Sequence, residues 1–164
     1  MRSATVVTTS EDQTVALGRH IGGLCTAGDV ILLSGELGAG KTCLIQGIAN
    51  GLAVSEYTFS PSFVLVREYH GRLMLYHMDF YRMETPAEVL DLGIEEYLDG
   101  DGVCAIEWAE RAADHLPREH LHIGLQYVPG AENSRRILLT ARGSRYEDML
   151  QQLTTATRSF AQWN

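Results

Sequence analysis

The sequence is almost without lysine. Lys41 is the only lysine among its 13 basic residues, and the other twelve are arginine. The formal net charge is −8, so the chain lacks the basic excess that marks a large nucleic-acid-binding surface. We therefore expect no extended basic surface for binding RNA or DNA. Direct contact with a nucleic acid stays open, because twelve arginines can still cluster locally.

Long apolar runs and paired cysteines are also missing. No stretch reaches the ~18 apolar residues that a membrane-spanning helix needs, which excludes such a helix and a membrane partner. Residues 1–13 show no apolar segment followed by the small-residue cleavage site of a secretion signal. The three cysteines, Cys25, Cys43 and Cys104, form no C-x-x-C pair and are expected to be reduced thiols. These features predict a cytoplasmic protein.

The chain has the length and composition of one domain, with 45% hydrophobic residues in 164. Helix-like and strand-like patterns interleave along it, which predicts a single α/β domain over residues 1–164. We expect a three-layer P-loop NTPase-like fold with a mixed, mostly parallel central sheet. The expected strands are 4–8, 29–35, 62–69, 72–80, 102–108, 120–128 and 134–142; the expected helices are 10–28, 41–52, one or two within 85–100, and a C-terminal helix from about 143.

Residues 35–42, GELGAGKT, fit the pattern G-x-x-x-x-G-K-[ST] and are called the glycine loop here. Glycines let backbone amides approach phosphate oxygens, and the positive end of the following helix favours the same anion. In such loops the lysine, here Lys41, reaches the β- and γ-phosphates, and the hydroxyl of Thr42 ligates Mg²⁺. Guanine recognition through N-K-x-D would need a second lysine, so ATP is the expected nucleotide.

Two acids end expected strands and are candidates for the metal, because Mg²⁺ prefers oxygen ligands. Glu107 follows a run of small apolar residues that suits a central strand beside the loop strand, so we favour it as the metal ligand. Asp79 would then orient water or the surroundings of the metal. His77 is expected to pack or to form a hydrogen bond. Trp108 is either a core aromatic residue or a residue that lies beside the nucleotide or faces a partner protein.

Three further stretches follow the glycine loop: SPSFVLVREY at 60–69, LYHMDFYR at 75–82 and AIEWAE at 105–110. In this order and at this spacing the four stretches resemble the TsaE family. That family comprises bacterial ATPases required for the threonylcarbamoyladenosine (t6A) modification of tRNA. The resemblance extends from about residue 9 to about residue 125.

The resemblance implies a weak ATPase that uses ATP and Mg²⁺ and acts with the proteins TsaB and TsaD. Such a protein does not itself make the threonylcarbamoyl group or transfer it. The implied catalytic residues are Lys41, Asp79 and Glu107, and the implied metal ligands are Thr42 and Glu107. The implied nucleotide-binding residues are Glu11 (base or sugar), Leu37, Gly38, Ala39, Gly40, Lys41 and Thr42 (phosphates), Ser60 and Ser62 (a switch-like segment), and Trp108.

Two alternatives to this function remain. A small-metabolite kinase would need arginines in a helical lid, whereas Arg135 and Arg136 lie in an expected strand. A nucleotide-gated interaction module would bind ATP with only incidental hydrolysis. Arg82 is a candidate cation for the site and equally a solvated or partner-facing arginine, and residues 129–136 are a candidate further nucleotide contact.

Overall fold

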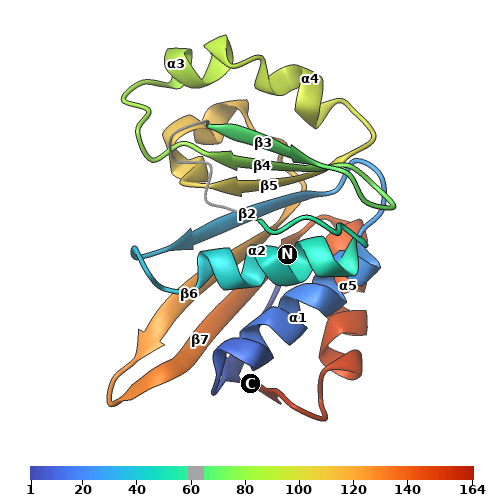
Figure 1. Cartoon of the computed structure of the whole chain (residues 1–164), viewed down its shortest axis with the longest axis vertical. Helices are drawn as coiled ribbons and strands as arrows, with labels where there is room; N and C mark the ends of the chain where they lie inside the picture. Colours follow the sequence, from blue (N-terminus) through green and yellow to red (C-terminus); the bar gives the residue numbers. More distant parts are fainter. Residues whose placement is uncertain (59–64) are drawn as a thin grey trace.

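A computed structural model describes residues 1–58 and 65–164 of the chain (Figure 1). No helix in these two stretches is both long enough and apolar enough to cross a membrane. The elements are β1 (Arg2–Thr8), α1 (Glu11–Leu24), β2 (Val30–Gly35), α2 (Lys41–Gly51), β3 (Val66–Tyr69), β4 (Leu75–Asp79), α3 (Pro86–Asp91), α4 (Ile94–Leu98), β5 (Val103–Glu107), the 3₁₀ segment η1 (Ala109–His115), β6 (His120–Val128), β7 (Ala131–Arg142), α5 (Ser144–Ala156) and β8 (Gln162–Trp163).

The strands form one eight-stranded sheet in the order β3-β4-β5-β2-β6-β7-β1-β8. Parallel pairing joins β4 to β5, β5 to β2 and β2 to β6, whereas the outer pairings are antiparallel. The expected mixed α/β sheet is confirmed, with its parallel part at the centre. The expected hairpin of β3 and β4 is also present.

Several element boundaries differ from the expected ones. The first helix stops at Leu24, because Cys25 is extended and the side chain of Asp29 accepts a hydrogen bond from the amide of Thr26. The strand expected from residue 72 begins at Leu75, because the amide of Arg72 is hydrogen-bonded to a carbonyl at the end of α2. Residues 62–64 of the strand expected at 62–69 lie outside the described residues.

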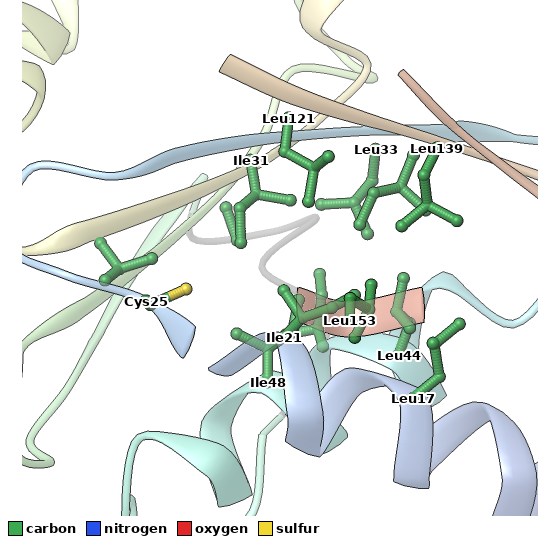
Figure 2. Close-up of a cluster of buried hydrophobic side chains, with 14 of the residues drawn as sticks. Leu17, Ile21, Cys25, Ile31, Leu33, Leu44, Ile48, Leu121, Leu139 and Leu153 are labelled. Carbon is green, nitrogen blue, oxygen red and sulfur yellow. The ribbon is translucent and has the colours of Figure 1, made fainter. Parts of the chain in front are cut away.

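The layers follow from the way β2 distributes its side chains. Ile31 and Leu33 enter a core with α1, α2 and α5, whereas Val30 and Leu32 enter a second core with α3, α4 and η1. Figure 2 shows strand and helix side chains of the first core facing one another. Because β2 is buried on both faces, its position in the sheet is tightly fixed.

Helices α1 and α2 touch through a seam of glycines, Gly18 and Gly22 on α1 and Gly47 and Gly51 on α2. A Cβ atom built on Gly47 would lie 2.1 Å from the carbonyl oxygen of Val15. One on Gly18 would lie 2.3 Å from the carbonyl oxygen of Leu44. The backbones therefore meet with no room for a side chain. This contact fixes α2, the helix that follows the glycine loop.

We expect Gly47→Ala to lower the free energy of unfolding by about 1–3 kcal/mol, the usual cost of overpacking. The control is Gly23→Ala, because a Cβ at Gly23 meets no atom within 4 Å. Alanine there should leave stability unchanged or raise it by about 0.5–1 kcal/mol, since it is the better helix former. Urea denaturation of both variants measures the difference. Equal stabilities would show that the seam tolerates a methyl group.

Candidate functional site

The glycine loop joins β2 to α2 through backbone conformations that glycine adopts without strain. The φ angles are +145° at Gly35, +78° at Gly38 and +101° at Gly40. The first turn of α2 begins at Lys41, directly after the last of these residues. A buried strand, a glycine-rich turn and a helix N-terminus in this order make a site suited to an anion.

A cavity of about 260 Å³, called the loop cavity here, opens beside the glycine loop. Most of the predicted site residues line it together, although they come from separate parts of the chain. Ala39 is not among the lining residues, because its side chain is buried in the core beneath the loop. The residues lining the loop cavity are Leu37, Gly38, Gly40, Lys41, Thr42, Cys43, Asp79, Tyr81, Glu107 and Trp108.

The two predicted acids are brought together by strand register. Glu107, the last residue of β5, pairs with Leu33 of β2 and with Asp79 at the end of β4. Both carboxylates therefore lie at the carboxyl edge of parallel strands, next to the glycine loop. Asp79 is 5% exposed and Glu107 is 4% exposed, so neither is an ordinary solvated acid at a strand end.

His77 binds Glu107 directly. Its Nε2 lies 2.8 Å from the Oε2 atom of Glu107, and the imidazole is fully buried. An ionised carboxylate only accepts hydrogen bonds, so Nε2 is the nitrogen that carries the hydrogen. The other ring nitrogen, Nδ1, has no hydrogen-bond partner within the described residues. The expectation that His77 forms a hydrogen bond is thus confirmed, and its partner is the predicted metal ligand.

The ammonium of Lys41 is held by the glycine loop itself. It donates to the carbonyl oxygens of Gly35 and Glu36 and lies 5.0 Å from the ring centroid of Trp108. The ring of Trp108 in turn packs on Tyr81, with 4.9 Å between the centroids. Trp108 has a φ of +57°, an uncommon conformation for a non-glycine residue that is often found at functional sites.

The β6–β7 hairpin supports the glycine loop from outside. The hydroxyl of Tyr127 donates to the carbonyl of Leu37 at 3.1 Å, and Nε of Arg135 donates to the carbonyl of Ala39 at 2.8 Å. The guanidinium of Arg135 also lies 4.6 Å from the Tyr127 ring centroid. Sequence analysis singled out residues 129–136 but could not identify these contacts, because no local pattern links a loop to residues about 90 positions away.

The other predicted residues lie in three different places. Glu11 lines a smaller hollow of about 60 Å³ that shares Gly38, Gly40 and Cys43 with the loop cavity. Arg82 is exposed and is not among the residues that line the loop cavity. The segment with Ser60 and Ser62 lies outside the described residues.

The thiol of Cys43 lines both hollows. Partial burial raises its pKa above the ordinary value, and the carboxylate of Glu11 raises it further, against the opposing effect of Arg135. The thiol therefore stays protonated at neutral pH and is a poor nucleophile. Burial likewise raises the pKa of the Cys25 and Cys104 thiols to about 12.

The donor set of the loop cavity is suited to Mg²⁺. Thr42 supplies a hydroxyl, and Asp79 and Glu107 supply carboxylates. Mg²⁺ prefers oxygen ligands and is usually held by one or two carboxylates together with water and substrate phosphates. Among the described residues, no cluster of three or more His, Cys, Asp or Glu side chains is placed to hold a metal alone.

We expect His77→Asn to lower the free energy of unfolding by about 1–3 kcal/mol, because the buried carboxylate of Glu107 loses its donor. His77→Gln is the matched variant, since its longer side chain places an N–H group near the position of Nε2. His77→Gln should therefore retain most of the stability that His77→Asn loses. Urea denaturation of both variants makes the comparison. Identical losses would mean that the bond to Glu107 contributes nothing beyond packing.

Comparison with known proteins identifies the family of this chain. The family described as "Threonylcarbamoyl adenosine biosynthesis protein TsaE" matches residues 8–137. A Bacillus subtilis protein named tRNA threonylcarbamoyladenosine biosynthesis protein TsaE is 41% identical, over 90% of this chain and 91% of that protein. A Treponema pallidum protein of the same name is 44% identical, over 80% of this chain and 96% of that protein.

A solved structure shows the same architecture. The crystal structure of Bacillus subtilis YdiB superimposes with a TM-score of 0.83 at 35% sequence identity. The match covers 96% of this chain and 97% of that one. Sequence and structure therefore agree over nearly the whole chain, and the protein belongs to the TsaE family of threonylcarbamoyl adenosine biosynthesis proteins.

Proposed function

We propose that the protein binds ATP and Mg²⁺ in the loop cavity and hydrolyses ATP slowly on its own. The proteins TsaB and TsaD stimulate this hydrolysis, and the ATPase supports the t6A modification of tRNA in the cytoplasm. The protein neither makes the threonylcarbamoyl group nor transfers it. The observation that carries the proposal is the convergence of Lys41, Thr42, Asp79 and Glu107 on one cavity at the N-terminus of α2.

Binding begins with the amides of the glycine loop, which together with the helix N-terminus attract the triphosphate. The Lys41 ammonium is hydrogen-bonded to neutral carbonyls of the loop. A phosphate offers it a charge-assisted bond that is roughly twice as strong. The lysine therefore turns from the loop to the phosphate when ATP binds. Glu11, beside the adjoining hollow, approaches the base or sugar.

Thr42 and Glu107 would hold Mg²⁺, which would neutralise part of the negative charge of the phosphates. The buried bond from His77 fixes the carboxylate of Glu107 in one orientation. Asp79 orients the attacking water and shares the edge of the sheet with Glu107. Trp108 closes one side of the cavity through its contacts with Lys41 and Tyr81.

The slow ATP hydrolysis that we propose for the isolated protein is explained by the small number of cations at the loop cavity. Lys41 is the only cation among the described residues that line the loop cavity. Related phosphate-loop enzymes gain about 10³–10⁵ in rate from an additional arginine placed on the transferring phosphate. We propose that binding of the partners supplies or aligns such a group.

Lys41→Ala should weaken ATP binding by about 10- to 100-fold, which corresponds to about 1.5–3 kcal/mol for hydrogen bonds to a charged group. Lys41→Arg should not restore the affinity, because a planar guanidinium does not replace a compact ammonium inside the loop. Calorimetric titration with ATP and Mg²⁺ measures both variants, and circular dichroism checks the fold. Unchanged affinity in Lys41→Ala would refute the site.

Glu107→Gln should abolish the ATP hydrolysis that TsaB and TsaD stimulate, while ATP binding in EDTA remains within about twofold of wild type, since no metal contributes there. Turnover and t6A formation are measured with purified partners. Full t6A formation without hydrolysis would identify a nucleotide-gated interaction module. A metabolite that stimulates turnover and becomes phosphorylated would identify a kinase.

A further inference from the structure

A second cavity, of about 620 Å³, lies on the sheet face opposite α1 and α2 and is called the sheet-face cavity here. Its size falls in the usual range for ligand-binding sites, about 300–1,000 Å³. It shares no lining residue with the loop cavity. Strands β2, β6 and β7 form one wall, and η1 with the segment after it forms the other: Leu32, Leu33, Ala109, Glu110, Ala113, Leu116, Pro117, Arg118, His120, His122, Thr140 and Arg142.

The sheet-face cavity has an apolar floor and a cationic rim. Leu32 and Ala109 are buried beneath it, whereas Arg118 and Arg142 are exposed at its edge. Neither guanidinium forms an ion pair with another described residue. Glu110 is the only acid among the described lining residues. Two arginines are therefore free to bind a carboxylate above an apolar surface.

Two histidines, His120 and His122, lie on the sheet wall of this cavity. Burial lowers the pKa of His122, and the nearby His120 and Arg142 lower it further, against the opposing effect of Glu110. The Nδ1 atom of His120 donates to the carbonyl of Pro117 at 2.8 Å, so only its Nε2 is left for another contact.

The charge of the sheet face contrasts with that of the whole protein. The net charge of the protein is −8. This face of the sheet nevertheless carries no acid among the outward side chains of two strand stretches, His120 to Gln126 of β6 and Arg136 to Arg142 of β7. The absence of acids and the presence of arginines on this face favour a short acidic segment as the occupant. Its few carboxylates would lie within a Debye length, about 8–10 Å, of the arginines. A long RNA would instead extend its phosphates over the acidic remainder of the surface.

The sheet-face cavity is connected to the nucleotide site through two elements. The Nε2 atom of His122 lies 3.0 Å from Oγ of Ser34, the residue directly before the glycine loop. The opposite wall, η1, begins directly after Trp108, which contacts Lys41. An occupant of the cavity would therefore contact segments continuous with both the glycine loop and Glu107.

We infer that the sheet-face cavity is a docking site for a segment of a partner protein that carries carboxylates beside an apolar side chain, and that docking there regulates the ATPase. The inference rests on the proposed function, because it identifies where a stimulating partner contacts the protein. The arginines hold the carboxylates, the floor receives the apolar side chain, and Ser34 and η1 transmit binding to the nucleotide site.

The first test is the double variant Arg118→Glu/Arg142→Glu, compared with Arg19→Glu/Arg158→Glu. Both change the net charge equally, and Arg19 and Arg158 are exposed residues outside the sheet-face cavity. ATP turnover is measured against the concentration of purified TsaB and TsaD. The concentration for half-maximal stimulation should rise at least about tenfold in the cavity variant alone, since charge reversal replaces attraction with repulsion. Equal behaviour of the two variants overturns the inference and leaves the proposed function intact.

The second test does not depend on those partners. A synthetic hexapeptide of alternating leucine and glutamate is titrated into ¹⁵N-labelled protein, with glutamine replacing glutamate in the control peptide. The acidic peptide alone should shift the amide signals of Ser34, Ala113 and His122, and it should fail to do so in Arg118→Glu/Arg142→Glu. No shift, or equal shifts with both peptides, overturns the inference.

The two tests separate the inference from the proposal on which it rests. If TsaB and TsaD fail to stimulate the wild-type protein, the proposed function fails and the peptide titration decides the docking site alone. A tRNA fragment that shifts the same amides while the acidic peptide does not would assign the cavity to nucleic acid and overturn the inference.

Discussion

The parallel hydrogen bonding of β2 to β5 is the constraint on which the candidate site depends. It places Glu107 beside Leu33, two residues before the glycine loop begins, and β4 continues the same register to Asp79. A slip of one residue would turn Glu107 to the other face of the sheet. Such a slip is prevented because β2 is buried on both faces, with alternate side chains in two separate cores.

Local sequence patterns predicted the parts of the fold whose signals are local. The strand, glycine loop and helix from Val30 to Gly51 were expected because an apolar run, a spaced glycine pattern and a helical pattern follow one another directly. For the 85–100 region the pattern left one or two helices open, and the structure has two, separated at Gly93, which adopts a φ of +71° between α3 and α4. Neither β8, which has two residues, nor the irregular η1 offers enough residues for a periodic signal.

The sequence allowed the residues of the candidate site to be predicted, but not the hydrogen bonds and packing contacts between them. Asp79 and Glu107 could be expected near the glycine loop, because carboxyl ends of neighbouring parallel strands lie at one edge of a sheet. The bond between His77 and Glu107 could not be derived in the same way, since it depends on which faces of β4 and β5 coincide. The glycine seam between α1 and α2 was missed for a similar reason: isolated glycines in a helix do not reveal what packs against them.

The support that the β6–β7 hairpin gives to the glycine loop has a consequence for the thermodynamics of the proposed ATP binding. A loop rich in glycine would ordinarily lose much conformational entropy on closing around an anion. Here Tyr127 and Arg135 already hold the carbonyls of Leu37 and Ala39, so much of that ordering is complete when the chain folds. The loop is preorganised, and less of the binding free energy is consumed in ordering the protein.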